Sequence, residues 1–311
     1  DGATTASGTF NITVTSVNQS PTVAVNTGTT VDEASGGNVI TTAMLNEGDP
    51  DDSGAGLTYT VTSVTGNGTL RNNGTALGLN DTFTQADIDA GLITYDHNGS
   101  EATADSFGFS LADGGEDGAT AATGTFNITV NPVNDDPSNA GGLPPDIAVT
   151  EDVASNVDLS MLDLSDADHG GSSLTVTLTT ATGGNLTATT GGGVTVAGSG
   201  SGTLTLTGTL ASLNTFLDTA SNITYLHGTP HTSGNDADTI TVEVSDNGNT
   251  GSGGGGNISL GVVNVDITAV NDSPIVATNT GSTVSEGSTG NTITTAMLDE
   301  GDVDDSSAGL T

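Results

Sequence analysis

The sequence predicts an all-β fold made of tandem β-sandwich repeats. Short runs such as Phe126-Asn127-Ile128-Thr129-Val130 alternate apolar and polar residues with the period of a β-strand. A connector of Val-Asn, two further residues and proline occurs at 17–21, 133–137 and 270–274. Long stretches of sequence also recur at the spacing of a domain, which is typical of a repeat protein.

The recurring stretches set the expected boundaries of the repeats. Residues 22–58 return at 275–311, and residues 1–21 return at 117–137. The proline that ends each connector keeps the preceding residue extended and interrupts strand pairing. We therefore expect the end of a preceding repeat, two complete repeats and the beginning of a following repeat, at 1–21, 22–136, 137–273 and 274–311.

The charge of the chain limits its partners. The chain has 38 acidic residues, a single arginine, no lysine and a net charge of −37. Nucleic acid is excluded as a natural partner because phosphate binding needs cationic side chains. Anionic membrane surfaces are disfavoured for the same reason, and no apolar run is long enough to insert in a membrane.

The composition predicts a thin core that needs outside stabilisation. Hydrophobic residues make up 32% and aromatic residues 3% of the chain, which is below the average for globular domains. Without cysteine or lysine there are neither disulfides nor isopeptide crosslinks, although the composition is that of an extracellular protein. A bound metal is the remaining means of stabilising the fold, and the carboxylates favour a hard cation such as Ca²⁺.

Apolar runs separated by Gly, Asn and Asp turns predict the elements of the first complete repeat. The stretch 83–91 predicts one helical turn that is closed by a glycine. Strands are expected at 22–25, 39–42, 57–64, 107–112 and 124–130.

The second repeat has the same kind of pattern. Leu210, Leu213, Phe216 and Leu217 predict a short helix that faces the core. The glycine-rich stretch 251–256 predicts a flexible loop between the last two strands. Strands are expected around Leu174/Val176/Leu178, Val194/Val196, Leu204/Leu206, Ile240/Val242/Val244 and Val263/Val265/Ile267.

Segment 83–114 resembles the CSPG repeat, a cadherin-like module. It contains the runs F-T-x-x-D-I-x-x-G, I-x-Y-x-H and D-S-F-x-F, followed by a closing D-G. The second repeat resembles cadherin-like domains of large bacterial surface adhesins at 149–152, 164–168, 239–246 and its Val-Asn-Asp connector. The resemblance implies seven-stranded Greek-key sandwiches strung end to end in an extended rod, with calcium at the junctions.

Three Asp-x-Asp groups are the first candidate metal ligands. Carboxylates two residues apart in a loop can point at one cation, although aspartate is also common in solvated turns. Each group is followed by Leu-Thr at a corresponding position, which favours the metal interpretation. The groups are Asp49/Asp51/Asp52, Asp166/Asp168 and Asp302/Asp304/Asp305.

The resemblance implies further ligands at the end of each repeat where the chain leaves it. A lone glutamate, the connector Asn-Asp and an aspartate before the sixth strand would complete each junction, although a surface charge or an Asn-Pro turn is the simpler explanation of each alone. The first junction would gather Glu33, Asp105, Asn134, Asp135, Asp166 and Asp168. The second would gather Glu151, Asp236, Asp238, Asn271, Asp272, Asp302 and Asp304. Gln19-Ser20 lacks the aspartates of the other connectors, which predicts a weaker site there.

The sequence predicts no catalytic centre. His227 and His231 are four residues apart, but the glycine and proline between them prevent the helix that would align them on zinc. The glycine-rich tracts lack the lysine and following helix of a phosphate loop. Paired carboxylates of a glycosidase lie in a cleft, whereas these are expected at joints.

The function expected from these features is structural. The chain would be part of a calcium-stiffened stalk of a large extracellular cell-surface protein that mediates adhesion or matrix formation. It would contact other repeats or other copies of itself, and a cell-surface protein or glycan is a further possible partner. A self-assembling filament and an array of carbohydrate-binding modules are the alternatives, although sugar sites usually expose aromatic residues, and those here are few and expected in the core.

Overall fold

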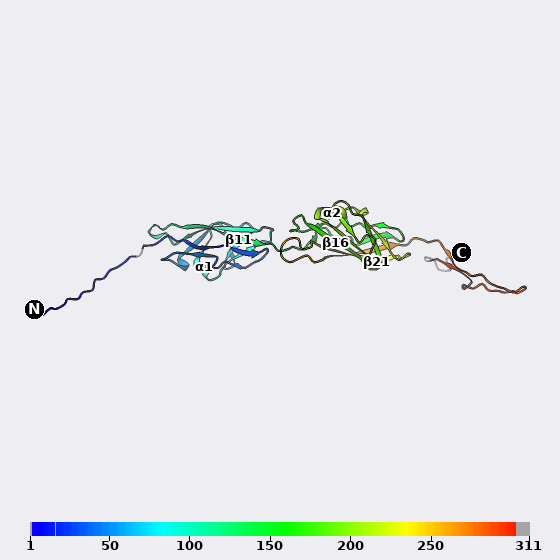
Figure 1. Cartoon of the computed structure of the whole chain (residues 1–311), viewed down its shortest axis with the longest axis horizontal. Coiled ribbons are helices and arrows are strands. Elements are labelled where there is room, and N and C mark those ends of the chain that lie inside the picture. Colours follow the sequence, from blue (N-terminus) through cyan, green and yellow to red (C-terminus); the bar gives the residue numbers. More distant parts are fainter. Residues whose placement is uncertain (1, 16, 303–311) are drawn as a thin grey trace. The chain divides into compact units, whose positions relative to one another are not determined.

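The structure, a computed structural model, describes residues 2–15 and 17–302. The chain divides into two compact units, Asp1–Val133 and Asn134–Thr311. Each unit has its own hydrophobic core and its own set of sheets, and Figure 1 labels β11 in unit 1 and β16 in unit 2. The all-β sandwich expected from the sequence is confirmed.

Unit 1 places strands that are distant in sequence next to each other. Its larger sheet has the order β2 (Thr29–Asp32), β11 (Ala122–Asn131), β10 (Ala104–Ala112), β5 (Thr58–Ser63) and β8 (Thr82–Thr84). β11 runs parallel to β2 and antiparallel to β10. The second sheet has the order β3 (Asn38–Val39), β9 (Ile93–His97), β6 (Gly68–Asn72) and β7 (Thr75–Ala76), and β1 (Val23–Asn26) pairs with β4 (Leu45–Glu47).

The period-two pattern buries one face of each long strand. Phe126, Ile128 and Val130 of β11 are buried, and the residues between them are exposed. Tyr59 and Phe83 stack with their ring centroids 4.9 Å apart. The few aromatic residues of the sequence are therefore concentrated inside unit 1, where burying each ring contributes most to stability.

The expected helical turn is α1 (Gln85–Asp89). The hydroxyl of Thr84 accepts the N–H of Asp87, and the carboxylate of Asp87 accepts the N–H of Thr84, so both helix-terminal donors are satisfied. Gly91 then adopts a φ of 68°, which ends the helix. The short 3₁₀ turns η1 (Gly54–Gly56) and η2 (Glu116–Gly118) complete the unit.

Unit 2 repeats this arrangement with longer strands. Its larger sheet has the order β13 (Asp146–Thr150), β22 (Ile258–Thr268), β21 (Gly234–Ser245), β16 (Ser173–Thr180), β19 (Thr203–Thr209) and β18 (Thr195–Ala197). The smaller sheet has the order β14 (Ser155–Asn156), β20 (Ile223–His227) and β17 (Gly184–Ala188). β12 (Ser138–Asn139) pairs with β15 (Leu164–Ser165).

The expected helix of unit 2 is α2 (Leu210–Leu217), followed by η3 (Ala220–Asn222). Leu213, Phe216 and Leu217 are buried, as the spacing predicts, whereas Leu210 is only partly buried against the core. The side chain of Thr209 accepts the N–H of Ser212 and caps the helix.

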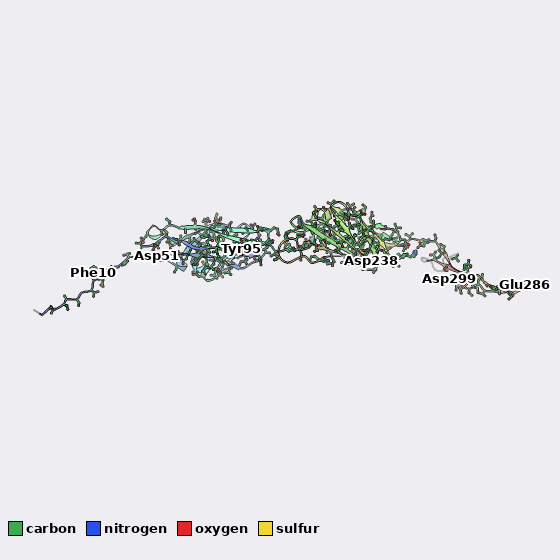
Figure 2. All side chains as sticks on the ribbon, in the orientation of Figure 1. Phe10, Asp51, Tyr95, Asp238, Glu286 and Asp299 are labelled. Atoms are coloured by element: carbon green, nitrogen blue, oxygen red, sulfur yellow. The ribbon has the colours of Figure 1, made fainter. Side chains whose placement is uncertain are left out.

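The structure departs from the sequence predictions mainly in short strands. The strand expected at 39–42 is limited to β3, because a turn begins at Thr41, whose carbonyl accepts the N–H groups of Met44 and Leu45. The segment after unit 2's last long strand forms a hairpin of β23 (Ile275–Asn279) and β24 (Leu298–Gly301). Near the N-terminus, Phe10 is 88% exposed although its sequence copy Phe126 is buried (Figure 2).

In each unit an aspartate of the larger sheet accepts the hydroxyl of a tyrosine of the smaller sheet. In unit 1, Asp105 accepts the N–H groups of Gly66 and Asn67 and the hydroxyl of Tyr95, with a donor–acceptor distance of 2.8 Å for the tyrosine. In unit 2, Asp238 accepts the hydroxyl of Tyr225 at 2.9 Å. Figure 2 labels Tyr95 and Asp238, one from each unit.

Asp238 is 1% exposed, and hydrogen bonds to both of its oxygens offset the free-energy cost of burying the carboxylate. Burial raises its pKa, but the N–H groups of Thr239 and Thr182 and the Tyr225 hydroxyl outweigh burial, so the pKa of Asp238 lies below its ordinary value. Further N–H groups, from Ala181 and Gly184, point at the same carboxylate. The aspartate, in β21, therefore accepts hydrogen bonds from β17, from β20 and from the turn between β16 and β17.

Replacing Asp238 with asparagine is expected to lower the unfolding free energy of unit 2 by about 3 kcal/mol, because hydrogen bonds to a charged acceptor are worth about 1.5–3 kcal/mol each. Urea denaturation at pH 7 in a chelator measures the change. The loss should shrink as the pH falls through the lowered pKa of Asp238, since protonation removes the same charge. Asp236→Asn, an exposed position where φ is 51°, is the matched control, and equal stability of the two variants would contradict the role of Asp238.

Candidate metal centre

Three aspartates converge at one end of unit 2. Asp166 and Asp168 follow β15, and Asp246 follows β21, about eighty residues later in the chain. Each contributes a carboxylate oxygen to a group whose members lie within 4.8 Å of one another. All three side chains are buried, with exposed fractions of 8%, 6% and 1%.

Local hydrogen bonds hold one oxygen of each carboxylate. Oδ1 of Asp166 accepts the N–H of Asp168, and Oδ1 of Asp246 accepts the N–H of Gly248. Oδ2 of Asp168 accepts the hydroxyl of Thr250 at 2.8 Å. These contacts orient the carboxylates and leave the second oxygen of each available.

The second oxygens are buried but have no hydrogen-bond partner within the described residues. They are Oδ2 of Asp166, Oδ1 of Asp168 and Oδ2 of Asp246. Buried carboxylate oxygens that face one another without donors repel strongly, and such orphaned groups need a proton or a cation. A hard cation with oxygen ligands, such as Ca²⁺, fits this donor set.

The electrostatics of the group agree with this interpretation. Burial, the side-chain hydrogen bond and negative charge of Asp168, and the charge of Asp246 together raise the pKa of Asp166 to about 6. Without a cation, a proton at Asp166 relieves the repulsion only below about pH 6, and the charges face one another at neutral pH.

The connector residues belong to the same end of unit 2. The N–H of Asp135 is donated to Oδ2 of Asp168 at 3.3 Å, and the N–H of Asn134 to the carbonyl of Ser252. Oδ1 of Asn134 is buried without a hydrogen-bond partner in the described part of the chain, and its Nδ2 is donated to the carbonyl of Asp135. The side-chain oxygen of Asn134 is thus a further neutral donor for a cation.

Unit 1 has the corresponding set of residues. Asp51 accepts the N–H of Gln19 through Oδ2, as Asp168 accepts that of Asp135. Asp113, which is 7% exposed, accepts the N–H of Gly115 through Oδ1, as Asp246 accepts that of Gly248.

Asp49 and Asn18 complete the unit 1 set. The N–H groups of Asp52 and Asp51 hold the pKa of Asp49 below its ordinary value, and Oδ2 of Asp49 is buried without a hydrogen-bond partner among the described residues. Nδ2 of Asn18 is donated to Asp113 at 3.0 Å. Asp51 and Asp113 thus contact the consecutive connector residues Gln19 and Asn18, and the N–H groups of Asp51 and Asp52 are both donated to Oδ1 of Asp49.

The predicted glutamates occupy equivalent positions at the other end of each unit. Glu33, 7% exposed, accepts the N–H of Val133 through Oε2 at 3.2 Å. Glu151, 2% exposed, accepts the N–H of Val270 through Oε1 at 2.6 Å. Both glutamates therefore fasten the residue that precedes the connector Asn-Asp.

Other predicted ligands have different neighbours from those expected. Both oxygens of Asp105 and of Asp238 are engaged by backbone N–H groups and tyrosines, as described above, because each carboxylate is turned into its own sandwich. Asp236 lies with Asp146 and Asp266 rather than with Asp272.

The remaining predicted ligands belong to the last connector and the segment after it. Asn271 donates its Nδ2 to the carbonyl of Asp272, as Asn134 does to that of Asp135. Asp302 directly follows β24. Asp304 and Asp305 lie outside the described residues.

Sequence reasoning missed Asp246 and Asp113. Each follows the last residue of a long alternating strand and starts an Asp-x-Gly turn, so a signal was present. That signal resembles an ordinary turn, and only the pairing of β21 with β16 brings Asp246 to the Asp-x-Asp loop.

Comparison with known proteins agrees with the fold. Residues 21–130 match the family model described as cadherin-like. In the described residues, none of the helices combines the length and the apolar character needed to cross a membrane.

Curated relatives match part of the chain. It is 32% identical over 147 residues to the human Extracellular matrix organizing protein FRAS1, and 40% identical over 116 residues to Extracellular matrix protein 3 of Lytechinus variegatus. These matches cover 43% and 37% of the chain, and only 4% of the length of each relative. The extracellular location expected from the composition agrees with these relatives.

Solved structures of cadherin repeats are also similar. The human mucin-like protocadherin EC1-2 is 16% identical, with a TM-score of 0.36, and the match covers 81% of this chain and 100% of that one. A protocadherin gammaB7 EC3-6 structure is 14% identical, with a TM-score of 0.39, and the match covers 84% and 50% of the two chains.

The raised pKa of Asp166 predicts how unit 2 responds to pH in a chelator. Between about pH 4 and pH 6 the folded state keeps a proton that the unfolded state has released, so this group's contribution to stability should fall as the pH rises through that range. Asp166→Asn should abolish this contribution, so the wild type should lose more stability than the variant between pH 4.5 and pH 7. Urea denaturation at both pH values tests this, with Asp163→Asn as the control, and parallel pH profiles of wild type and Asp166→Asn would contradict it.

Proposed function

We propose that this chain is a stretch of cadherin-like repeats in an extracellular matrix or adhesive protein, and that each repeat binds Ca²⁺ where its connector enters. The observation that carries the proposal is the set of buried, partnerless oxygens on Asp166, Asp168 and Asp246. The match of residues 21–130 to the cadherin-like family model supports the same assignment.

Calcium would stabilise the fold by neutralising charge that the chain cannot neutralise itself. Arg71 is the only basic residue apart from histidine, and its guanidinium already binds Asp96 at 2.6 Å. A divalent cation converts the mutual repulsion of Asp166, Asp168 and Asp246 into attraction to a shared ligand. When bound, the ion supplies positive charge and a coordination centre, and the chain supplies the oriented oxygens.

The same ion would hold the connector. In unit 2, Asp135 is bonded to the ligand residue Asp168, and in unit 1, Val133 is bonded to Glu33. Fixing the Asp166–Asp168 loop with a cation would therefore also restrict the connector residues attached to it. We infer that calcium stiffens the chain at its connectors and that the array serves as an extended spacer or adhesive stalk.

The relatives support an extracellular structural role over catalysis. The names of two of them describe extracellular matrix proteins, and the chain spans a small part of their length. Binding to other copies of the same protein, or to a further matrix component, would be a property of the longer protein that contains these repeats.

Asp246→Asn is expected to weaken Ca²⁺ binding by unit 2 on the order of tenfold, because it removes one of three charged ligands. Calorimetric titration of the full chain measures the affinity of each site. Saturating calcium stabilises a native state by about 2.7 kcal/mol at a hundredfold excess over Kd, so the melting temperature of unit 2 should also respond less to calcium in the variant. Asp163→Asn, in an exposed position three residues before Asp166, is the control, and an unchanged affinity in Asp246→Asn would reject the assigned centre.

Removing Asp166 and Asp168 together is expected to loosen the connector without unfolding the sandwiches, whose cores do not use these side chains. In calcium, small-angle scattering of Asp166→Asn with Asp168→Asn should show a broader and more compact distribution of particle dimensions than the parent chain. Circular dichroism checks that the strand content is unchanged. If the double variant and the parent chain give the same scattering profile in calcium, the hypothesis that calcium stiffens the connector is wrong.

A further inference from the structure

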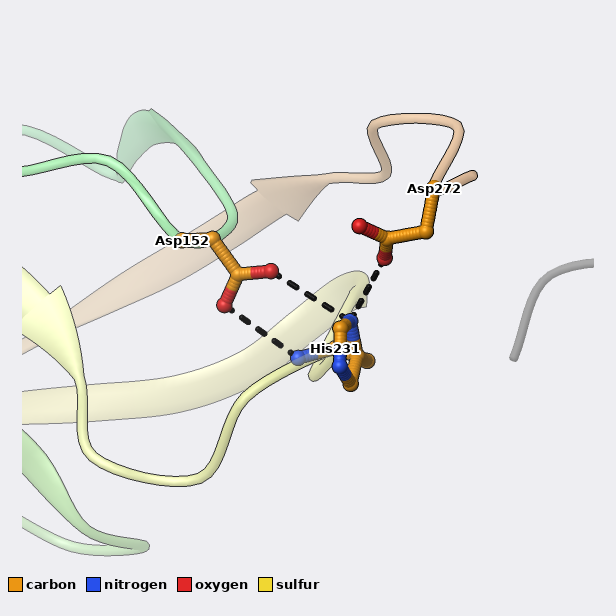
Figure 3. A group of neighbouring side chains, drawn as sticks. All are labelled: Asp152, His231 and Asp272. Atoms are coloured by element: carbon orange, nitrogen blue, oxygen red, sulfur yellow. Dashed lines mark hydrogen bonds and ion pairs between the residues drawn. The ribbon is translucent and has the colours of Figure 1, made fainter. Parts of the chain in front are cut away.

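A histidine lies between two aspartates at the end of unit 2 opposite to the calcium centre proposed above. Nδ1 of His231 is 2.6 Å from Oδ2 of Asp272 and 3.3 Å from Oδ2 of Asp152 (Figure 3). The three residues come from separate stretches of chain: the turn after β13, the loop between β20 and β21, and the connector after β22. One ligand atom of each lies within 4.8 Å of the other two.

Unit 1 has a carboxylate where unit 2 has this histidine. Strands β9 and β20 carry the related sequences Ile-Thr-Tyr-Asp-His and Ile-Thr-Tyr-Leu-His, and the fourth residue after each of these runs is Glu101 in unit 1 and His231 in unit 2. In unit 1, an oxygen of Glu101 lies within 4.8 Å of one of Glu33. The two units thus use one scaffold to present an all-oxygen group in one case and an imidazole with carboxylates in the other.

This difference changes which cation is favoured. Ca²⁺ and Mg²⁺ prefer oxygen ligands, whereas an imidazole nitrogen with carboxylates suits borderline divalent ions such as Zn²⁺. We propose that His231, Asp152 and Asp272 form a binding site for a borderline divalent cation, with Zn²⁺ as the representative ion, through Nδ1 and one oxygen of each carboxylate.

The local geometry suits such an ion. Ligand atoms around a tetrahedral Zn²⁺ with bonds of about 2.0–2.1 Å lie about 3.3 Å apart. The His231–Asp152 distance of 3.3 Å already has this value, and the His231–Asp272 distance of 2.6 Å needs to open by less than about 1 Å. Oδ1 of Asp152 accepts the backbone N–H of His231, and this hydrogen bond orients Oδ2 toward the imidazole. Hydrogen bonds of this kind orient the ligands in metal sites.

The site is accessible, and it is separate from the calcium centre. The three side chains are 36–40% exposed, so an ion can reach them from solvent and water can complete the coordination. His227, the other histidine of the loop, takes no part, because its ring nitrogens contact the carbonyls of Thr229 and Thr182. The proposal therefore does not depend on the His227–His231 pair, nor on calcium binding at Asp166, Asp168 and Asp246.

The test is a titration of the full chain with Zn²⁺ in saturating Ca²⁺, followed by calorimetry. Wild type is expected to bind one Zn²⁺ whose affinity falls on the order of tenfold or more in His231→Ala. His231→Glu, which copies Glu101 of unit 1, should lose Zn²⁺ binding at this site to the same extent. His227→Gln is the matched control and should bind Zn²⁺ as the wild type does.

A second variant tests whether a loss of Zn²⁺ binding comes from the lost ligand or from misfolding. Asp152→Asn keeps a residue type that tolerates the observed φ of 59° and removes one charged ligand, so it should also weaken Zn²⁺ binding while circular dichroism shows a folded chain. Equal Zn²⁺ affinity in the wild type and His231→Ala, or no Zn²⁺ binding by the wild type, would overturn the proposal. Since calcium is saturating throughout, a failure here leaves the calcium centre untouched, and a failure of calcium binding in the Asp246→Asn experiment leaves this site untouched.

Discussion

Buried negative charge without matching positive charge is the constraint on which this structure depends. The chain carries a net charge of −37 and has one arginine, yet it buries several carboxylates almost completely. A buried carboxylate needs hydrogen-bond donors, a proton or a cation. Asp105, which is partly buried, and Asp238, which is buried, each accept backbone N–H groups and a tyrosine hydroxyl. At the end of unit 2, Asp166, Asp168 and Asp246 retain oxygens that no donor in the described chain satisfies.

Carboxylates satisfied by hydrogen-bond donors and carboxylates that lack donors have different consequences for stability. Fixed N–H and hydroxyl donors hold the pKa of Asp238 below its ordinary value, so the charged form of this carboxylate contributes to stability at neutral pH. In the group of Asp166, Asp168 and Asp246, burial and the neighbouring carboxylates instead raise the pKa of Asp166 to about 6. The contribution of this group to stability therefore depends on the protons or cations that the solvent supplies. The unsatisfied carboxylates lie where the connector enters unit 2, so the proposed cation would also order the connector residues. Under that proposal, a chain with few aromatic residues and no disulfides would link its stiffness to an external cation.

The sequence predicted the features that depend on local periodicity, and it failed where distant segments meet. Alternation located the long strands, and the stretch 83–91 with its closing glycine located α1. The two-residue strands of the smaller sheets carry too few residues for a periodic signal. Asp166 and Asp168 could be proposed together because they are two residues apart in the sequence, whereas Asp246 was missed because strand pairing brings it to them. Asp238 was misplaced for a related reason, since strand periodicity does not reveal that N–H groups of another loop surround its carboxylate.

His231 shows how such repeats can diversify without changing their core. The loop between β9 and β10 in unit 1, and between β20 and β21 in unit 2, lies outside the hydrophobic clusters, so a substitution there costs little packing energy. The strands on either side, together with the tyrosine–aspartate pair that joins the sheets, fix where the loop residue is presented. Exchanging a glutamate for a histidine at that position changes the ligand from oxygen to nitrogen while the scaffold stays the same. With the cation sites proposed for this chain, cation preference would therefore vary from repeat to repeat under weak constraint from folding. The buried, mutually repelling aspartates Asp166, Asp168 and Asp246 would keep their preference for a hard cation.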